Sequence, residues 1–169
     1  FDIRQARAPD MLKAYLLFAA VHRERGEGKK DEQLADKAIE RMVQVNPDSA
    51  RAFLIRGNYL RETNSAGSME KRRERRKHAK ESLQKALELD GEDIDILLAN
   101  AGLARQEKNY VLALEYLERA QQISPEDEQI YIDQAATSRQ NRNFKEGVAY
   151  LKKGFEILPE NPPLVMELF

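Results

Sequence analysis

The sequence predicts an all-α protein built from stacked pairs of helices. Two observations carry this prediction: a 34-residue internal repeat, and apolar residues that recur at three- and four-residue spacing. The composition agrees with it. Of the 169 residues 41% are hydrophobic and 34% are charged, whereas about a quarter of the residues in an average globular protein are charged. So many charges indicate a helical protein with a large surface.

The repeat is clearest in the second half of the chain. Three segments superpose at successive shifts of 34 residues, with small and large apolar residues at matching places. The aligned sets are Ala79-Leu83-Ala86-Leu89-Gly91, Ala113-Leu117-Ala120-Ile123-Pro125 and Gly147-Leu151-Gly154-Ile157-Pro159. Small residues allow paired helices to approach closely, and proline stops a helix because it lacks an amide hydrogen.

A 34-residue unit with a large residue followed by a small one, then Ala-x3-large-x2-Ala and Pro, resembles the tetratricopeptide repeat. The resemblance covers four units, from residue 12 to residue 161. It implies a right-handed superhelical solenoid in which the first helix of each repeat lines a concave groove.

The same spacing, with two insertions, divides the chain into parts of one solenoid domain. The parts are 1–11 (which could be the tail of a preceding repeat), 12–49 (repeat 1, short insertion at 26–30), 50–93 (repeat 2, ten-residue insertion within 64–78 that extends a basic helix), 94–127 (repeat 3), 128–161 (repeat 4) and 162–169 (the start of a truncated repeat). We therefore expect an internal fragment of a longer repeat array.

Each repeat is expected to contribute two helices. The expected ranges are 12–25, 31–45, 50–63, 69–89, 94–107, 110–123, 128–141 and 144–157. One departure concerns packing: where the family usually has Leu in the first helix, this chain has Arg56, Asn100 and Gln134. These positions are expected to be less buried than in the family, or the Arg56 stem to lie over the neighbouring helix.

The first helices carry the candidate binding site. In the resembled family their second, fifth, ninth and twelfth positions face the ligand, and steps of three and four return to one helix face. The twelfth position is arginine in all four repeats. The candidate groove residues are Lys13, Arg23, Arg51, Leu54, Asn58, Arg61, Leu98, Arg105, Ile132 and Arg139. An apolar floor with arginines suits an extended peptide that carries carboxylates. Alternatively, the arginines stabilise helix carboxyl ends or pair with nearby glutamates.

A second candidate is a basic run in the insertion of repeat 2. The cations of this basic edge are Lys71, Arg72, Arg73, Arg75, Arg76, Lys77 and Lys80. The run could serve nuclear import, bind phosphates, or dock an acidic partner; it contains no aromatic residue to stack on bases, which disfavours single-stranded nucleic acid. The alternative is a solvated helix extension, partly neutralised by Glu70, Glu74 and Glu81.

Catalytic motifs are absent from the sequence. It has no Cys and two His, which excludes disulfides, thiolate chemistry and Cys-ligated metals. Acidic clusters at 92–95 and 126–128 fall where first helices begin, where carboxylates cap free amides. We expect no enzyme activity, cofactor, metal, small-molecule substrate or membrane span.

The expected function is protein–protein interaction, with a peptide of a partner held in the concave groove. The alternatives are binding of nucleic acid or an anionic surface through the basic edge, and a regulatory or substrate-presenting segment of a larger enzyme. The oligomeric state stays open, and of the compartments a soluble, cytoplasmic one is slightly favoured.

Overall fold

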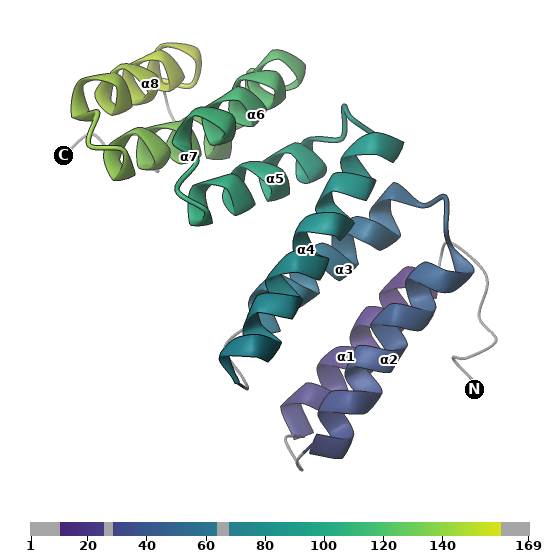
Figure 1. Cartoon of the computed structure of the whole chain (residues 1–169). Helices are drawn as coiled ribbons and strands as arrows, with labels where there is room; N and C mark the ends of the chain where they lie inside the picture. Colours follow the sequence, from purple (N-terminus) through teal and green to yellow (C-terminus); the bar gives the residue numbers. More distant parts are fainter. Residues whose placement is uncertain (1–10, 26–28, 64–67, 160–169) are drawn as a thin grey trace. The chain divides into compact units, whose positions relative to one another are not determined.

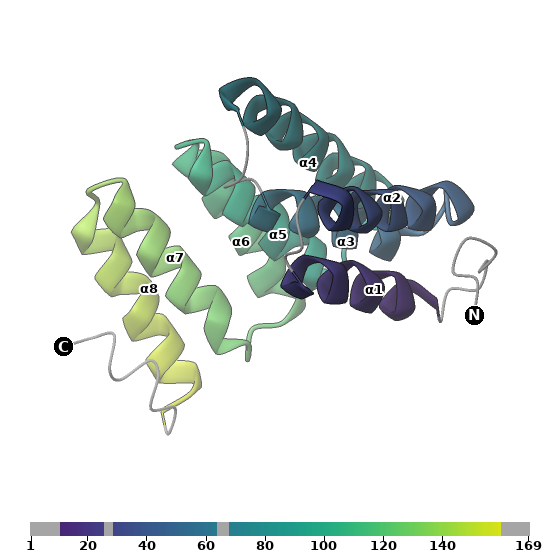
Figure 2. The ribbon, with the colours of Figure 1, turned by 90° about the horizontal axis from the view of Figure 1, so that it is seen from below.

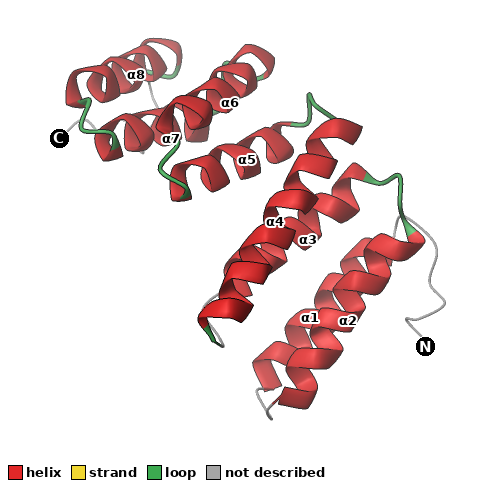
Figure 3. Cartoon of the chain, in the orientation of Figure 1, coloured by secondary structure: helices red, strands yellow, loops and turns green. Residues whose placement is uncertain are grey.

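The computed structural model describes residues 11–25, 29–63 and 68–159, shown in Figures 1 and 3. All the helices in these ranges are α-helices and the ranges contain no strand, which confirms the all-α prediction. The parts predicted at 1–10 and 162–169, and the centres of both insertions at 26–28 and 64–67, lie outside the described residues. The chain forms two compact units, Phe1–Asp90 and Gly91–Phe169. The division falls three residues before the predicted start of repeat 3.

The helices lie within two residues of their expected bounds. Unit 1 contains α1 (Leu12–Arg25), α2 (Lys29–Val45), α3 (Ala50–Glu62) and α4 (Met69–Leu89). Unit 2 contains α5 (Ile94–Gln106), α6 (Tyr110–Ile123), α7 (Glu128–Gln140) and α8 (Phe144–Ile157). Each odd-numbered helix packs along the next even-numbered one, and Figures 1 and 2 show these pairs side by side.

Polar side chains fix where the helices begin. The Asp93 carboxylate accepts a hydrogen bond from the Ile96 amide at 3.1 Å, and Asp127 accepts one from the Gln129 amide at 3.0 Å. Ser49 and Asn109 cap α3 and α6 in the same way. Such caps satisfy amides that have no partner inside the helix. The two predicted acidic clusters therefore have the structural role that the sequence indicates.

Small residues set the distance between paired helices. A Cβ atom added to Gly57 of α3 would lie 2.6 Å from the Leu83 side chain of α4. In unit 2 a Cβ atom added to Gly154 of α8 would lie 2.8 Å from Cγ of Tyr131 in α7. Leu83 and Tyr131 are themselves fully buried. A large residue on one helix thus occupies the space that a small residue on its partner leaves.

The turns inside unit 2 repeat the same backbone geometry at a 34-residue interval. Lys108 and Arg142 have positive φ angles of 60° and 62°. The next residue, Asn109 or Asn143, donates its amide to the carbonyl of Ala104 or Ser138 at 2.9 Å in both turns. The left-handed conformation costs a residue with a Cβ about 1–2 kcal/mol, so the helix pairing is strong enough to impose it twice.

The expectation of low burial at the three polar first-helix positions was wrong. Asn100 is 5% exposed and Gln134 is fully buried. Asn100 Nδ2 donates to the Ile96 carbonyl at 2.9 Å, whereas Nε2 of Gln134 is buried without a hydrogen-bond partner. The Arg56 side chain reaches across to α2 and α4, where it bonds to Glu40 at 2.8 Å and to Ser82 at 3.0 Å. The repeat therefore buries these positions whatever their polarity, because neighbouring helices surround them.

Replacing Gly154 by Ala should destabilise unit 2. The added methyl group would push against the buried Tyr131 ring, and overpacking of this kind costs about 1–3 kcal/mol. Better helix propensity returns roughly 0.5–1 kcal/mol. We expect a net loss in the free energy of unfolding, measured by urea titration. The reverse change at the exposed Ala149 of the same helix measures the propensity contribution alone. A more stable Gly154→Ala variant would show that the Tyr131 ring does not require this gap.

Replacing Gln134 by Met should stabilise unit 2. Met has a similar length and removes the buried amide nitrogen, whose missing hydrogen bond costs about 1–3 kcal/mol. The single bond that is lost, from Gln121 to Oε1 at 3.4 Å, is long. We expect the thermal midpoint to rise. The matched control is Asn100→Leu, which sacrifices a 2.9 Å bond and should gain less. A lower midpoint for Gln134→Met would contradict this account of the buried amide.

Candidate functional site

The predicted groove residues of unit 1 differ in their exposure. Lys13 and Arg51, at the second positions of α1 and α3, are both exposed. Leu54 is only 3% exposed, so it offers almost no apolar surface to a ligand. Asn58 and Arg61 are half-buried, and Arg61 Nη1 donates to Asn58 Oδ1 at 3.3 Å. Leu16, which follows Lys13 on the same face of α1, is 41% exposed.

The predicted groove residues of unit 2 form a second stretch of this surface. Leu98 of α5 and Ile132 of α7 are half-buried, and Ile132 packs against the core residues Tyr131, Ala135 and Leu151. Arg139 is exposed at the end of α7. Each unit thus presents part of a first-helix surface with apolar residues and cations.

The arginines at the twelfth positions connect successive first helices. All four lie in the last turn of their helix, where a cation favours the helix dipole. Arg23 of α1 donates to the hydroxyl of Tyr59 in α3 at 3.3 Å, and its guanidinium lies 5.6 Å from the centre of that ring. Arg105 of α5 pairs with Asp133 of α7 at 3.0 Å. Within each unit, one arginine therefore links two first helices.

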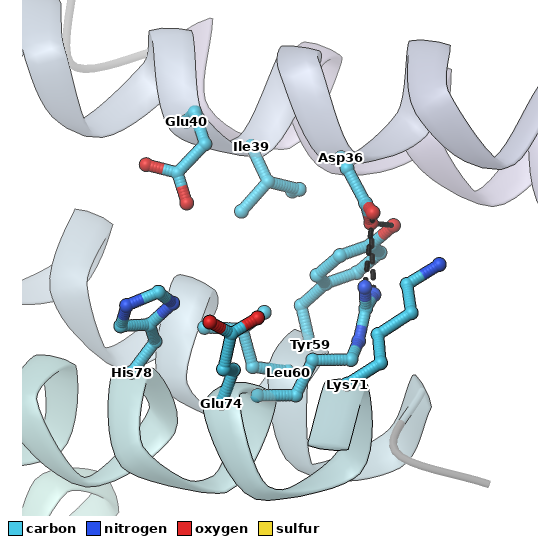
Figure 4. Close-up of a pocket in the computed structure, with 9 residues that line it drawn as sticks. Asp36, Ile39, Glu40, Tyr59, Leu60, Lys71, Glu74 and His78 are labelled. Atoms are coloured by element: carbon cyan, nitrogen blue, oxygen red, sulfur yellow. Dashed lines mark hydrogen bonds and ion pairs between the residues drawn. The ribbon is translucent and has the colours of Figure 1, made fainter. Parts of the chain in front are cut away.

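A buried ion pair in unit 1 includes a residue of the predicted basic edge. Arg75 of α4 is 9% exposed and makes two hydrogen bonds to the Asp36 carboxylate of α2, at 2.9 and 2.8 Å. It also donates to Thr63 Oγ1 at 2.9 Å. The Tyr59 hydroxyl donates to Asp36 at 2.8 Å, as Figure 4 shows. We call Asp36, Tyr59, Thr63 and Arg75 the Arg75 cluster; it joins α2, α3 and α4.

The Arg75 cluster holds its charges in fixed partners. Burial raises the pKa of the Tyr59 phenol, the nearby Asp36 carboxylate raises it further, and Arg23 opposes this shift. Tyr59 therefore stays neutral and donates to Asp36. A neighbouring cavity of about 190 Å³ is lined by residues of α2, α3 and α4 that include Glu74 and His78 (Figure 4). Because Asp36 and Arg75 satisfy each other, the cluster acts as a structural bridge.

The remaining cations of the basic edge face outward from α4. Arg73, Arg76, Lys77 and Lys80 are exposed, and their spacing of three, four and seven residues places them on one face of the helix. Lys77 pairs with Glu81 at 3.8 Å, and Lys71 lies 4.0 Å from Glu32 of α2. Arg72 is half-buried. The sequence could have indicated the inward Arg75, because Ala79 and Leu83 continue its side of the helix at four-residue spacing.

The described ranges show neither a metal site nor a membrane-spanning helix. No group of three or more His, Cys, Asp or Glu side chains there could hold a metal ion. None of the described helices combines the length and the apolar character that crossing a bilayer requires.

Removing Arg75 should destabilise unit 1 more than removing an exposed cation. In Arg75→Met, Asp36 loses both guanidinium bonds. Loss of one partner of a buried pair costs about 3–5 kcal/mol, and we expect roughly half of that because the Asp36 side chain is 32% exposed. Lys77→Met is the control, since exposed pairs contribute about 0.2–1 kcal/mol.

Urea unfolding of Arg75→Met, Asp36→Asn and the double variant measures the coupling between the two residues. The double variant should lose about 0.5–3 kcal/mol less than the sum of the single variants, as for residues in direct contact. If Arg75→Met unfolds at the same urea concentration as Lys77→Met, the cluster does not stabilise the unit.

Comparison with solved structures places this arrangement among known repeat proteins. The structure of PilF from Pseudomonas aeruginosa matches with a TM-score of 0.67 at 20% identity, over 94% of this chain and 66% of that one. TTC0263, a thermophilic TPR protein in Thermus thermophilus, matches with a TM-score of 0.73 at 15% identity, over 95% and 80% of the two chains. MamA from Desulfovibrio magneticus RS-1 gives 0.68 at 17% identity, over 96% and 84%.

The chain spans just under two thirds of the PilF structure, and its identity to all three structures is low. No protein-family model and no curated protein matches its sequence. The structural matches agree with the 34-residue repeat, the eight helices of the described residues and the small-to-large contacts inside each pair. The chain has the fold of the tetratricopeptide-repeat proteins.

Proposed function

We propose that this chain is a protein-interaction module that holds an extended or helical peptide of a partner on its first-helix surface. The observation that carries the proposal is the combination of exposed Lys13 and Leu16 on α1 with exposed Arg51 on α3. Apolar surface beside cations suits a peptide with apolar and acidic side chains. The half-buried Asn58 amide can bond to the peptide backbone.

The structure narrows which cations can serve the peptide. Arg23 and Arg105 are bonded to Tyr59 and Asp133 of the next first helix, so moving them would break contacts inside the units. Lys13 and Arg51 occupy first turns, where a cation opposes the helix dipole. Helix stability gives no reason for cations there, which favours a role in binding.

A second candidate function is binding of an anionic surface or nucleic acid through α4. The observation that favours it is that Arg73 and Arg76 are both exposed, and neither has an acidic partner among the described residues. Contacts of this kind go to phosphates, and their affinity falls steeply with salt.

A peptide selection tests the first proposal. Random twelve-residue peptides displayed on phage are selected on the chain, and the affinity of an enriched synthetic peptide is measured by fluorescence anisotropy. We expect acidic and apolar residues to be enriched. Reversing the charges, Lys13→Glu with Arg51→Glu, should weaken binding at least about tenfold, or roughly 1.4 kcal/mol, while the unfolding midpoint stays the same.

Two control variants separate the candidates. Lys37→Glu changes an exposed cation on α2 and should leave the affinity unchanged. Arg73→Glu with Arg76→Glu removes the proposed anion site on α4. If this variant alone loses binding, the second candidate is favoured. If no peptide is enriched, or all variants bind equally, the first-helix surface is not the site.

A further inference from the structure

Unit 2 has an open apolar face at the end of its second helix pair. Residues of α7 and α8 line a hollow of about 140 Å³, which includes Ala136, Leu151 and the larger side chains Val148 and Phe144. Phe144 is 62% exposed and Val148 is 46% exposed. Arg139 is part of the same lining and is exposed. No described element covers this face.

The corresponding face one repeat earlier is covered. A shift of 34 residues takes Phe144 and Val148 to Tyr110 and Leu114, which are half-buried. Helix α7 packs against α6 there. The same shift takes Arg139 to Arg105, whose guanidinium pairs with Asp133 of α7 at 3.0 Å. What closes this face in the earlier repeat is thus a first helix that supplies apolar side chains and one carboxylate.

Charge restricts what can close the open face. Arg139, Arg142 and Lys145 are exposed in or next to its lining. Arg139 has no acidic partner among the described residues, although its equivalent Arg105 does. An occupant must therefore bring acidic as well as apolar side chains. The first helix of a second copy would instead present the cations Lys13, Arg23 and Arg25, so charge disfavours it.

The chain itself contains a segment with this chemistry, residues 162–169, which lies outside the described residues. The 34-residue shift that relates the repeats brings Leu164 onto Ile130, which is fully buried, and Glu167 onto Asp133. Glu160 and Glu167 are the charged side chains of residues 160–169. A carboxylate therefore stands at the position from which Asp133 reaches Arg105.

We propose that residues 162–169 dock on the α7–α8 face of the same chain, with Glu167 paired to Arg139 and Leu164 against Phe144 and Val148. Arg139 then does for this segment what Arg105 does for α7. The proposal concerns a contact within the chain and does not depend on the proposed peptide binding by unit 1.

Cross-linking tests the placement directly, because the chain has no Cys. The full chain is prepared with Arg139→Cys and Glu167→Cys and treated with a short bismaleimide. We expect an intrachain cross-link to form at least about tenfold faster than in the control pair Lys153→Cys and Glu167→Cys. Lys153 is a matched control because it lies on the other side of α8, where it donates to Gln121 of α6 at 3.0 Å.

A charge exchange tests the ion pair without cross-linking. Arg139→Glu and Glu167→Arg should each lower the urea midpoint of unfolding, and the two together should restore it. Combining Arg139→Glu with Glu160→Arg should not. Equal intrachain cross-linking in the two Cys pairs, or no recovery on exchange, would overturn the proposal. Cross-links that form only between chains would show that a second copy covers the face, which overturns it as well.

Discussion

An apolar face that a helix pair cannot bury by itself is the constraint on which this structure depends. Small residues such as Gly57 and Gly154 bring two helices together, and the large residues opposite them, Leu83 and Tyr131, become fully buried. The pair still has an outer face. In unit 2, α7 covers that face of the preceding pair, and Arg105 and Asp133 fix its register. A repeat protein is stable because neighbours share their faces in this way.

The two units meet this constraint with different chemistry. Where α6 carries Tyr110 and Leu114, the equivalent positions of α4 carry Arg76 and Lys80, both exposed. A helix with cations there has little apolar surface to bury. In the first pair the equivalent of Leu114 is Asp36, which is bound by Tyr59 and Arg75. Unit 1 thus joins its helix pairs partly through charges, where unit 2 uses mainly apolar contacts.

This difference bears on function. Cations that bridge helices, such as Arg23, Arg75 and Arg105, are held by partners and contribute to the stability of their unit. Cations that serve no bridge, such as Lys13 and Arg73, are exposed. The distinction separates residues that build the repeat from residues that remain for a partner, and it divides what looked in the sequence like a uniform arginine row and a uniform basic run.

The sequence by itself determined the repeat, the helix bounds and the capping role of the acidic clusters, because these follow from local spacing and from one helix end at a time. It also indicated the small-to-large contacts, since both residues recur at 34-residue intervals. Only the tertiary structure decided that Arg75 points inward, that Leu54, Asn100 and Gln134 are buried, and that Arg23 bonds to Tyr59. Burial and pairing depend on residues from other helices, and no spacing along a single helix specifies which of them will be near.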